Sequence, residues 1–542
     1  MPFAKFKFKP GINKEGTNYS NENGWFDADK IRFRKGRPEK IGGWEKYSSN
    51  TFQGTCRKIH VYKDIEQSQY KILGTHKKLY ALEGDVYNDI TPIRSTTSAG
   101  DVTFAATNGS STITATDTSH GAVAGDFVTF SDAATLGGNI TAAVLNQEYE
   151  IVSIPNSNTF TFVAKDTSGT EVTANSSDTG NGGSSTVGTY QINVGLDVYV
   201  ASTGWGVDTW GAGTFGSATA LSLTNQLRLW TIDNFGDDVI AAPRGGPIYY
   251  WDESSGLGTR AVLASSRSGA SNTPVAVSQL LMSDVDRHVI ALGCNPIGSS
   301  TIDPLLVRFS DAENAVDWTP TATNSAGGVR LSTGSLIVGG LQTRQEILIW
   351  TDVGVVSMRF VGQPFIFSFN EIATGMSLIS PNGAATAGGV VYFMDDGAFY
   401  QYAGSVQKLP CTVLDYIFSD FNKGQAYKVF AAPNPKYNEI IWFYPSASST
   451  EIDRYVTYNY LENSWSIGTT SDGFVRTAWN PAYSLDYPIA ASKNDDSGLN
   501  YLYNQEFGCL ADGNGFTAFI ESSDFDLDPA GEKFMFMSKL IP

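Results

Sequence analysis

RKIHVYKDIEQSQYKILGTHKKLYALEGDVYNDITPI, residues 57–93, holds the pattern that decides the fold. It contains four short runs, RKIHVYK, YKILGTH, KKLYALEGD and VYNDITPI, which are separated by turn-forming residues. Apolar residues that alternate with polar ones are typical of β-strands with one buried face. Four consecutive strands in so short a stretch are typical of one blade of a β-propeller. We therefore predict residues 57–94 as a first blade.

The ending of this unit recurs along the chain with altered residues. The echoes are GGPIYYWDESSG at 245–256, DGAFYQYAG at 396–404 and GLNYLYNQEFG at 498–508, each with paired or nearby aromatics before a turn. Residues 192–515 are therefore predicted as the remainder of the propeller. Together with the first blade they give about six to eight blades, at roughly 40 to 60 residues each.

Composition supports an all-β chain. Of the 542 residues, 41% are hydrophobic and only 17% are charged, while 55 Gly and 25 Tyr indicate many turns and half-buried strands. Residues 95–191 differ from the rest, because they contain one basic residue, Lys165, among abundant Thr, Ser, Ala and Gly. Alternating segments within them predict an inserted small β-sandwich or barrel, which projects from the propeller.

Residues 1–56 form a basic N-terminal arm. In KIRFRKGRPEKIGGW, residues 30–44, a strand would place Lys30, Arg32 and Arg34 on one side and Ile31 and Phe33 on the other. Two interpretations stay open: an edge strand protected by charge against aggregation, or a docking surface. The candidate docking residues are Lys30, Arg32, Arg34, Lys35 and Arg37. Residues 516–542 are predicted as a C-terminal strand segment that closes onto the arm or begins a further unit.

Charge is divided unevenly along the chain. The first 78 residues contain 17 Lys and Arg against 8 Asp and Glu, whereas the rest contains 20 against 47. An acidic body does not bind nucleic acid by counterion release, which requires Lys and Arg facing phosphates. Repulsion of nucleic acid is expected instead.

Motifs for chemistry are absent. The four histidines, His60, His76, His120 and His288, form neither H-E-x-x-H nor another metal spacing, and no G-x-S-x-G or phosphate-binding glycine motif occurs. DFDLD at 524–528 imitates a calcium loop, but Pro529 stands where the turn glycine belongs. We therefore predict a non-enzymatic protein with no catalytic, cofactor-binding or metal-binding residues and no cofactor.

The remaining signals concern redox state and targeting. The four cysteines are far apart in the sequence: Cys56, Cys294, Cys411 and Cys509. We predict that they are free thiols; the alternative is that they form two disulfide bridges. No apolar stretch approaches the roughly 20 residues that span a bilayer, and no secretory signal is recognisable. The expectation is a soluble protein without membrane insertion.

Five segments resemble the tail-nozzle proteins of short-tailed bacteriophages, also called tail-hub or packaged-DNA-stabilisation proteins. They are KIRFRKGRPEKIGGW at 30–44, LLVRFSDAENAVDWTPTATNSAG at 305–327, ILIWTDVGVVSMRFVGQP at 347–364, YNEIIWFYPS at 437–446 and VTYNYLENSWSIG at 456–468. The resemblance implies a hexameric ring in the virion tail, assembled in the bacterial cytoplasm beneath the portal and its adaptor. Tail needle, plug or fibre proteins are the further partners it implies, and double-stranded DNA would pass without sequence-specific binding.

Two other functions remain open at this stage. The first is a receptor- or glycan-binding tail protein that uses the propeller or the insertion, for which Trp205, Trp210 and Trp230 are candidate sugar-stacking residues or else core residues. The second is a polysaccharide-degrading enzyme, which would need two carboxylates about 5 to 10 Å apart in a cleft. The sequence singles out no such pair.

Overall fold

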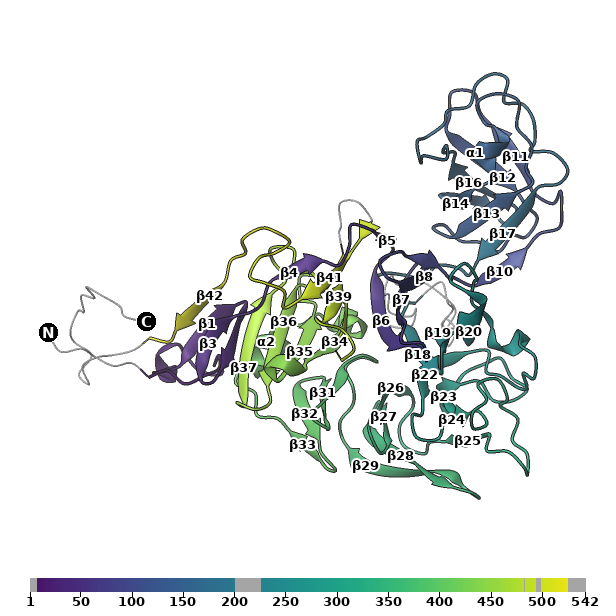
Figure 1. Ribbon diagram of the computed structural model, residues 1–542. Helices are drawn as coiled ribbons and strands as arrows, with labels where there is room; N and C mark the ends of the chain where they lie inside the picture. The colour runs from purple at the N-terminus through teal and green to yellow at the C-terminus, as the bar shows by residue number, and fades with distance from the viewer. Residues whose placement is uncertain (1–6, 200–225, 482, 494–498, 525–542) are drawn as a thin grey trace, which may run out of the picture.

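The computed structural model describes residues 7–199, 226–481, 483–493 and 499–524. In this part of the chain seven four-stranded antiparallel sheets follow one another around a ring, as Figure 1 shows, and a smaller β-domain stands beyond them. The all-β propeller with an inserted β-domain is thus confirmed, and seven blades fall within the predicted range.

The strands of each blade are named A to D from the axis outward. Blades 1 to 3 comprise β6 (Cys56–Lys63), β7 (Gln69–Thr75), β8 (Leu79–Glu83) and β9 (Asn88–Asp89); β18 (Trp230–Phe235), β19 (Asp238–Pro243), β20 (Tyr249–Trp251) and β21 (Val262–Leu263); β22 (Val277–Met282), β23 (Val289–Cys294), β24 (Asp303–Phe309) and β25 (Gly327–Arg330).

Blades 4 to 7 continue around the ring. They comprise β26 (Ile337–Gln342), β27 (Ile347–Thr351), β28 (Gly354–Gly362) and β29 (Ile366–Thr374); β30 (Ala384–Ala387), β31 (Val390–Asp395), β32 (Ala398–Tyr402) and β33 (Val406–Lys408); β34 (Phe430–Asn434), β35 (Glu439–Tyr444), β36 (Arg454–Asn459) and β37 (Ser464–Thr469); β38 (Ala478–Asn480), β39 (Ile489–Ala491), β41 (Leu502–Gln505) and β4 (Trp44–Lys46).

Short elements connect the blades. In these links lie η3 (Ala264–Ser266), α2 (Leu414–Ser419) and η4 (Lys423–Lys428). Other short elements are η1 (Tyr19–Asn21) in the arm, η2 (Glu253–Ser255) and η5 (Pro435–Tyr437) in turns of blades 2 and 6, and the pair of β5 (Phe52–Gln53) with β40 (Leu499–Asn500).

The aromatic echoes seen in the sequence have a common structural position. KKLYALEGD supplies β8, and the three later echoes supply β20, β32 and β41, so each provides the C strand of its blade. Aromatic C strands fit a propeller because large side chains fill the space between blades as it widens away from the axis.

Apolar cores between adjacent blades hold the ring together. Ile72 and Tyr70 of blade 1 pack with Trp230 of blade 2, and equivalent clusters join every neighbouring pair, including blades 4 and 5 through Trp350 and Phe393. Each blade therefore buries both faces, which explains strands such as β35 and β23 that are buried at every position.

An N-terminal strand closes the ring, which corrects the predicted boundary of the arm. Trp44 pairs with Gln505 and Lys46 with Tyr503, so β4 is the D strand of blade 7, although it lies in the segment assigned to the arm. Trp44 is buried and its ring lies 4.9 Å from that of Phe474 and 4.7 Å from that of Phe516. Because β4 continues along the chain into β6 of blade 1, its pairing with β41 links the last blade to the first and helps to close the ring.

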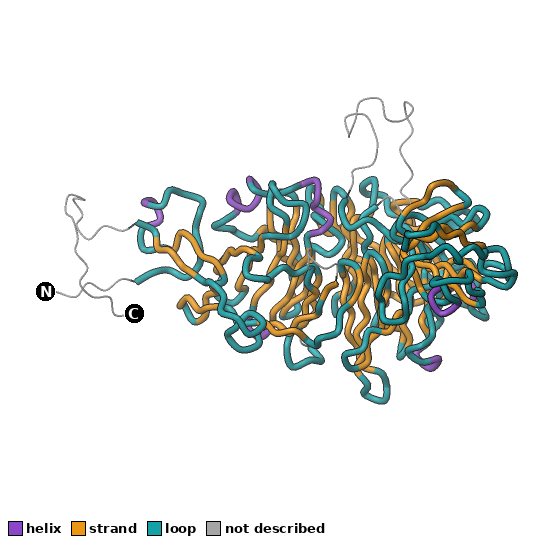
Figure 2. The backbone as a smooth tube through the Cα atoms, turned by 90° about the horizontal axis from the view of Figure 1, so that it is seen from above, coloured by secondary structure: helices purple, strands orange, loops and turns teal. Residues whose placement is uncertain are grey.

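The rest of the arm packs beside blade 6. It contains β1 (Trp25–Asp29) and the hairpin of β2 (Ile31–Arg34) and β3 (Arg37–Lys40), and it contacts β37. β42 (Phe519–Ser522) pairs with β1, so this part of the C-terminal segment does meet the arm. Figure 2 shows these strands at one end of the molecule.

The inserted domain is a small sandwich with its own core. One sheet contains β10 (Ile93–Thr96), β17 (Val187–Gln191), β13 (Phe127–Ser131) and β14 (Glu148–Glu150), and the other contains β11 (Thr103–Ala106), β12 (Thr112–Thr116), β16 (Thr159–Val163) and β15 (Ser153–Asn156). The short helix α1 (Ala142–Leu145) adds Leu145 to a core that includes Phe130 and Phe162. Its first strand begins at Ile93, slightly before the predicted start of the domain.

Excision of this domain is expected to leave the propeller folded. Its first and last strands pair with each other, with Ile93 opposite Gln191, so a short Gly-Ser turn in place of residues 97–188 spans the gap without strain. Thermal unfolding followed by near-ultraviolet circular dichroism should shift by less than about 5 °C. Loss of the cooperative transition would show that the propeller depends on the insertion.

The two faces of the propeller carry different connections. Since strands alternate in direction, the A–B and C–D turns lie on one face, called here the AB face, and the B–C turns and the links between blades lie on the other, the BC face. The insertion follows a D strand and contacts the B–C turn of blade 1, where Lys78 Nζ lies 2.8 Å from Asp89 and also pairs with Glu148 of β14. It therefore belongs to the BC side.

Candidate interaction surfaces and the hub network

The basic hairpin β2–β3 is divided between buried and exposed cations. Lys30 and Arg32 are buried, whereas Arg34, Lys35 and Arg37 are exposed. The predicted docking surface of five residues is therefore wrong for two of them. The predicted alternation of exposed cations and buried apolar residues does not hold, for two reasons. Lys30 has a left-handed backbone with φ of 55°, and β2 is covered on both sides.

Arg32 is held inside the protein by two carboxylates. It pairs with Glu506, its Nε lies 3.5 Å from Oε1 of Glu439, and its guanidinium stacks 3.7 Å from the ring centre of Tyr437. Burial raises the pKa of Glu439 to about 8, while the neighbouring charge of Arg32 acts in the opposite direction. Arg32 consequently fastens the arm to blades 6 and 7.

Lys30 has a similar internal role. Its Nζ lies 2.9 Å from Oδ2 of Asp29 and donates to Oγ of Ser471 at 2.6 Å. A third contact reaches Oδ2 of Asp472 at 3.4 Å. These bonds anchor β1 to the end of blade 6 and leave Lys30 without exposed charge.

The exposed tip of the hairpin is fixed in shape. Lys35 and Gly36 both have positive φ, 52° and 73°, as the two-residue turn of a tight hairpin requires. The carboxylate of Glu462 accepts from both turn amides, at 3.0 Å from Gly36 N. Glu462 lies in the C–D turn of blade 6, so the tip stands at the AB face.

The AB face also exposes apolar side chains. Among the described propeller residues, every large apolar side chain more than half exposed lies at an A–B or C–D turn, with exposed fractions between 54% and 82%. These residues are Ile65, Val86, Val285, Val361, Phe365, Leu461 and Tyr483. These residues lie on turns of five blades, and the face that they share is the candidate surface for binding other proteins.

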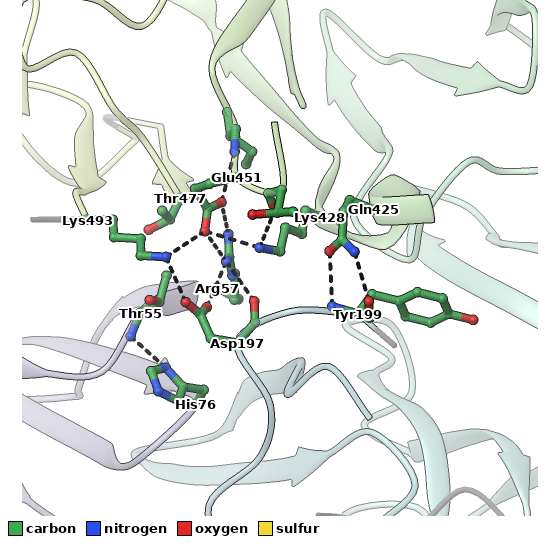
Figure 3. A network of polar contacts seen from close by, with 12 residues as sticks. Thr55, Arg57, His76, Asp197, Tyr199, Gln425, Lys428, Glu451, Thr477 and Lys493 are labelled. Carbon is green, nitrogen blue, oxygen red and sulfur yellow. Dashed lines mark hydrogen bonds and ion pairs between the residues drawn. The ribbon is translucent and has the colours of Figure 1, made fainter. Parts of the chain in front are cut away.

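A buried network of charges lies on the opposite face, and Figure 3 shows it from close by. Arg57, at the start of the inner strand of blade 1, donates from Nη1 and Nη2 to Oε1 and Oε2 of Glu451 at 2.8 and 2.7 Å. Its Nη2 also donates to Oδ1 of Asp197 at 2.8 Å. Such bidentate pairs are among the strongest hydrogen-bonded contacts between side chains.

Two lysines complete the network. Lys428 Nζ lies 3.2 Å from Oε2 of Glu451, while Lys493 Nζ lies 2.9 Å from Oδ2 of Asp197 and 3.3 Å from Oε2 of Glu451. Burial by itself would raise the pKa of Glu451, but Arg57 and the two lysines outweigh it and hold this pKa far below its usual range. Glu451 therefore stays ionised at all moderate pH values.

Residues beside the network add hydrogen bonds that hold further parts of the chain in place. Gln425 of η4 donates from Nε2 to Tyr199 O at 2.8 Å and accepts from Tyr199 N at 3.0 Å. Burial lowers the pKa of His76 to about 4, so it is neutral at pH 7, and its Nδ1 accepts from Thr55 N at 2.8 Å. The network and these hydrogen bonds together join blades 1, 6 and 7 to the segment that follows the insertion.

Sequence reasoning missed this network entirely. Its charged members run from Arg57 to Lys493, and only the closure of the ring brings them together. No local spacing could have indicated it.

The structure also shows where some of the other predicted site residues lie. Trp230 is a core residue whose Nε1 donates to Thr75 O at 2.8 Å, which decides between the two interpretations offered for it. Trp205 and Trp210, like Asp526 and Asp528 of the calcium-like segment, lie outside the described residues. All four cysteines are free, and Cys56 and Cys294 are buried.

Metal-binding and membrane-spanning features were also sought. Within the ranges that the structure describes, no three His, Cys, Asp or Glu side chains gather as metal ligands. No described helix has the length and apolar character needed to cross a bilayer.

Comparisons with known proteins show only distant likeness. No family model and no curated protein matches the chain. Solved structures that match include Kluyveromyces lactis Hsv2 (9% identity, 43% of this chain and 60% of that chain, TM-score 0.26) and Synechocystis apocarotenoid oxygenase (8%, 68% and 86%, 0.29). The endosialidase of phage phi92 also matches (12%, 98% and 71%, 0.20). The chain thus spans less than two thirds of the Hsv2 structure.

Proposed function

We propose that the protein is a non-enzymatic, ring-forming subunit of a short phage tail, a nozzle through which the packaged genome leaves the particle. The observation that carries this proposal is the AB face, where exposed apolar side chains stand beside a rigid basic hairpin tip. A surface of this kind suits permanent assembly with other proteins. The nozzle-like segments quoted above agree with it.

The tip has the chemistry to dock on an acidic neighbour. Arg34, Lys35 and Arg37 lie at or beside a turn whose backbone Glu462 fixes, so little backbone freedom is lost on binding. We assign this surface to the portal adaptor. Contacts between unlike surfaces of neighbouring subunits then close a hexameric ring, on which needle, plug or fibre proteins assemble.

Charge supports the role as a conduit. Beyond residue 78 the chain contains 20 Lys and Arg against 47 Asp and Glu. A lumen lined by acidic side chains repels DNA, which carries one charge per about 1.7 Å, and lets it slide without sticking. In this proposal the protein belongs to the virion tail.

Charge reversal at the tip tests the docking step. The triple variant Arg34→Glu, Lys35→Glu, Arg37→Glu should weaken adaptor binding at least about a hundredfold, because rim charges that face opposite charge now repel it. Binding is measured by biolayer interferometry, and ring formation by two-dimensional class averages of negatively stained particles. Wild-type rings with six-fold symmetry are the expected result.

The matched control is Lys165→Glu, an exposed position in the insertion. Unchanged adaptor binding by the triple variant would refute the docking role. Wild-type protein that stays monomeric with the adaptor present would refute the nozzle function itself.

A further inference from the structure

A pocket of about 640 Å³ opens between blades 4 and 5 on the AB face. Its walls come from the A–B turns of both blades and from the C–D turn of blade 5, and Tyr483 from the A–B loop of blade 7 also lines it. Volumes of this size are typical of small-molecule sites. The basic hairpin tip of Arg34, Lys35 and Arg37 does not line this pocket, whereas Tyr483 belongs both to its rim and to the exposed apolar residues of the AB face.

The pocket presents two accessible cations. Arg344, at the tip of the turn after β26, is exposed and has no ion pair or hydrogen bond of its side chain within the described part of the chain. Arg359 of β28 is 53% exposed and is held by its Nε, which lies 2.9 Å from Oε2 of Glu346. One guanidinium is thus free and the other is fixed in place.

Glu346 organises the floor of the pocket. It is buried, its Oε1 accepts from Tyr402 Oη at 2.6 Å, and Ser357 Oγ also donates to it. Burial would raise the pKa of Glu346, but Arg359 and these hydroxyls outweigh burial and lower it. With Glu346 ionised, the three charged side chains of the pocket sum to one positive charge.

Two further features select the ligand. Gly388 and Gly389 leave the backbone of the next turn uncovered, with no atom within 4 Å of where a Cβ would stand. Tyr483, 70% exposed, offers a flat ring at the rim.

We propose that this pocket binds a carboxylate-bearing sugar residue of an acidic polysaccharide. Arg344 and Arg359 hold the carboxylate, Tyr483 stacks on the apolar face of the pyranose ring, and the uncovered backbone of the glycine turn bonds to hydroxyl groups. The single net positive charge of the pocket attracts an anionic group, and the carboxylate of an acidic sugar supplies one. The proposal stands independently of the nozzle function.

Titration of the intact protein tests the site. The probes are an oligogalacturonate tetrasaccharide and an α2,8-linked sialic acid trimer, followed by calorimetry and saturation-transfer NMR. At least one should bind, and Arg344→Gln or Tyr483→Ala should weaken it at least about tenfold, the loss expected for a hydrogen bond to a charged group. Arg330→Gln, an exposed arginine on the outer strand of blade 3, should leave affinity unchanged.

The identity of the ligand is tested separately. Methyl esterification of the carboxylates should abolish binding, since the ester retains the ring and hydroxyls but not the charge. Equal binding of the ester, equal binding by Arg344→Gln, or no binding of either sugar at 10 mM would overturn the proposal. Binding of poly-glutamate alone would assign the pocket to an acidic peptide and would also overturn it.

Discussion

Trp44→Ala should destabilise the propeller by about 3–5 kcal/mol, the cost typical of removing a large buried aromatic side chain. Trp44 is almost fully buried and packs on Phe474 and Phe516, so its loss leaves a cavity in the core between blades 6 and 7. The effect should exceed that of an ordinary core substitution, because β4 is attached to blade 7 only by non-covalent contacts.

Guanidinium unfolding followed by tryptophan fluorescence measures the loss. Limited proteolysis should show early cleavage near β4 and β41 in the variant but not in the wild type. Tyr19→Ala is the matched control, since Tyr19 is an aromatic residue of the same arm that is 68% exposed. Equal stability of Trp44→Ala and wild type would mean that β4 does not close the ring.

Glu451→Gln should cost about 3–5 kcal/mol at pH 7, because it leaves Arg57, Lys428 and Asp197 in a buried network with an excess of positive charge. The neutral amide keeps the size of the side chain but cannot neutralise the guanidinium. Glu66→Gln, an exposed glutamate in the A–B turn of blade 1, should change stability by no more than about 0.5 kcal/mol.

The difference between the two proteins should depend on pH in a defined direction. The folded pKa of Glu451 lies below its unfolded value, so its contribution is fully present above the unfolded pKa of about 4.3 and is lost as pH falls through the folded pKa. The difference in unfolding free energy between wild type and Glu451→Gln should therefore begin to narrow below about pH 4 and keep narrowing as pH falls further. A gap that is unchanged at pH 3 would show that the effect is steric.

The architecture could be predicted from local sequence because its signals are local. Strand alternation and aromatic C strands recur within single blades, and the insertion differs in composition from its surroundings. The exact blade number could not be predicted, since loops between strands vary from Gly388–Gly389 in blade 5 to the long A–B loop of blade 7.

The candidate sites were less predictable because they depend on distant contacts. Lys30 and Arg32 looked like surface charges, since nothing near them in sequence indicates that Glu439, Glu506 and Asp472 approach after folding. The same applies to the pocket, where residues from blades 4, 5 and 7 meet. Isolated charges in a strand pattern do not indicate their partners.

Closure by β4 also affects the timing of folding during synthesis. The partner strand of β4, β41, is synthesised some 450 residues after Trp44, at about 5–20 residues per second. For that interval the ring is open, and β4 is present without the three other strands of blade 7. Nascent chains should therefore depend on chaperones, and interrupted synthesis yields an open fragment that the cell can recognise and degrade.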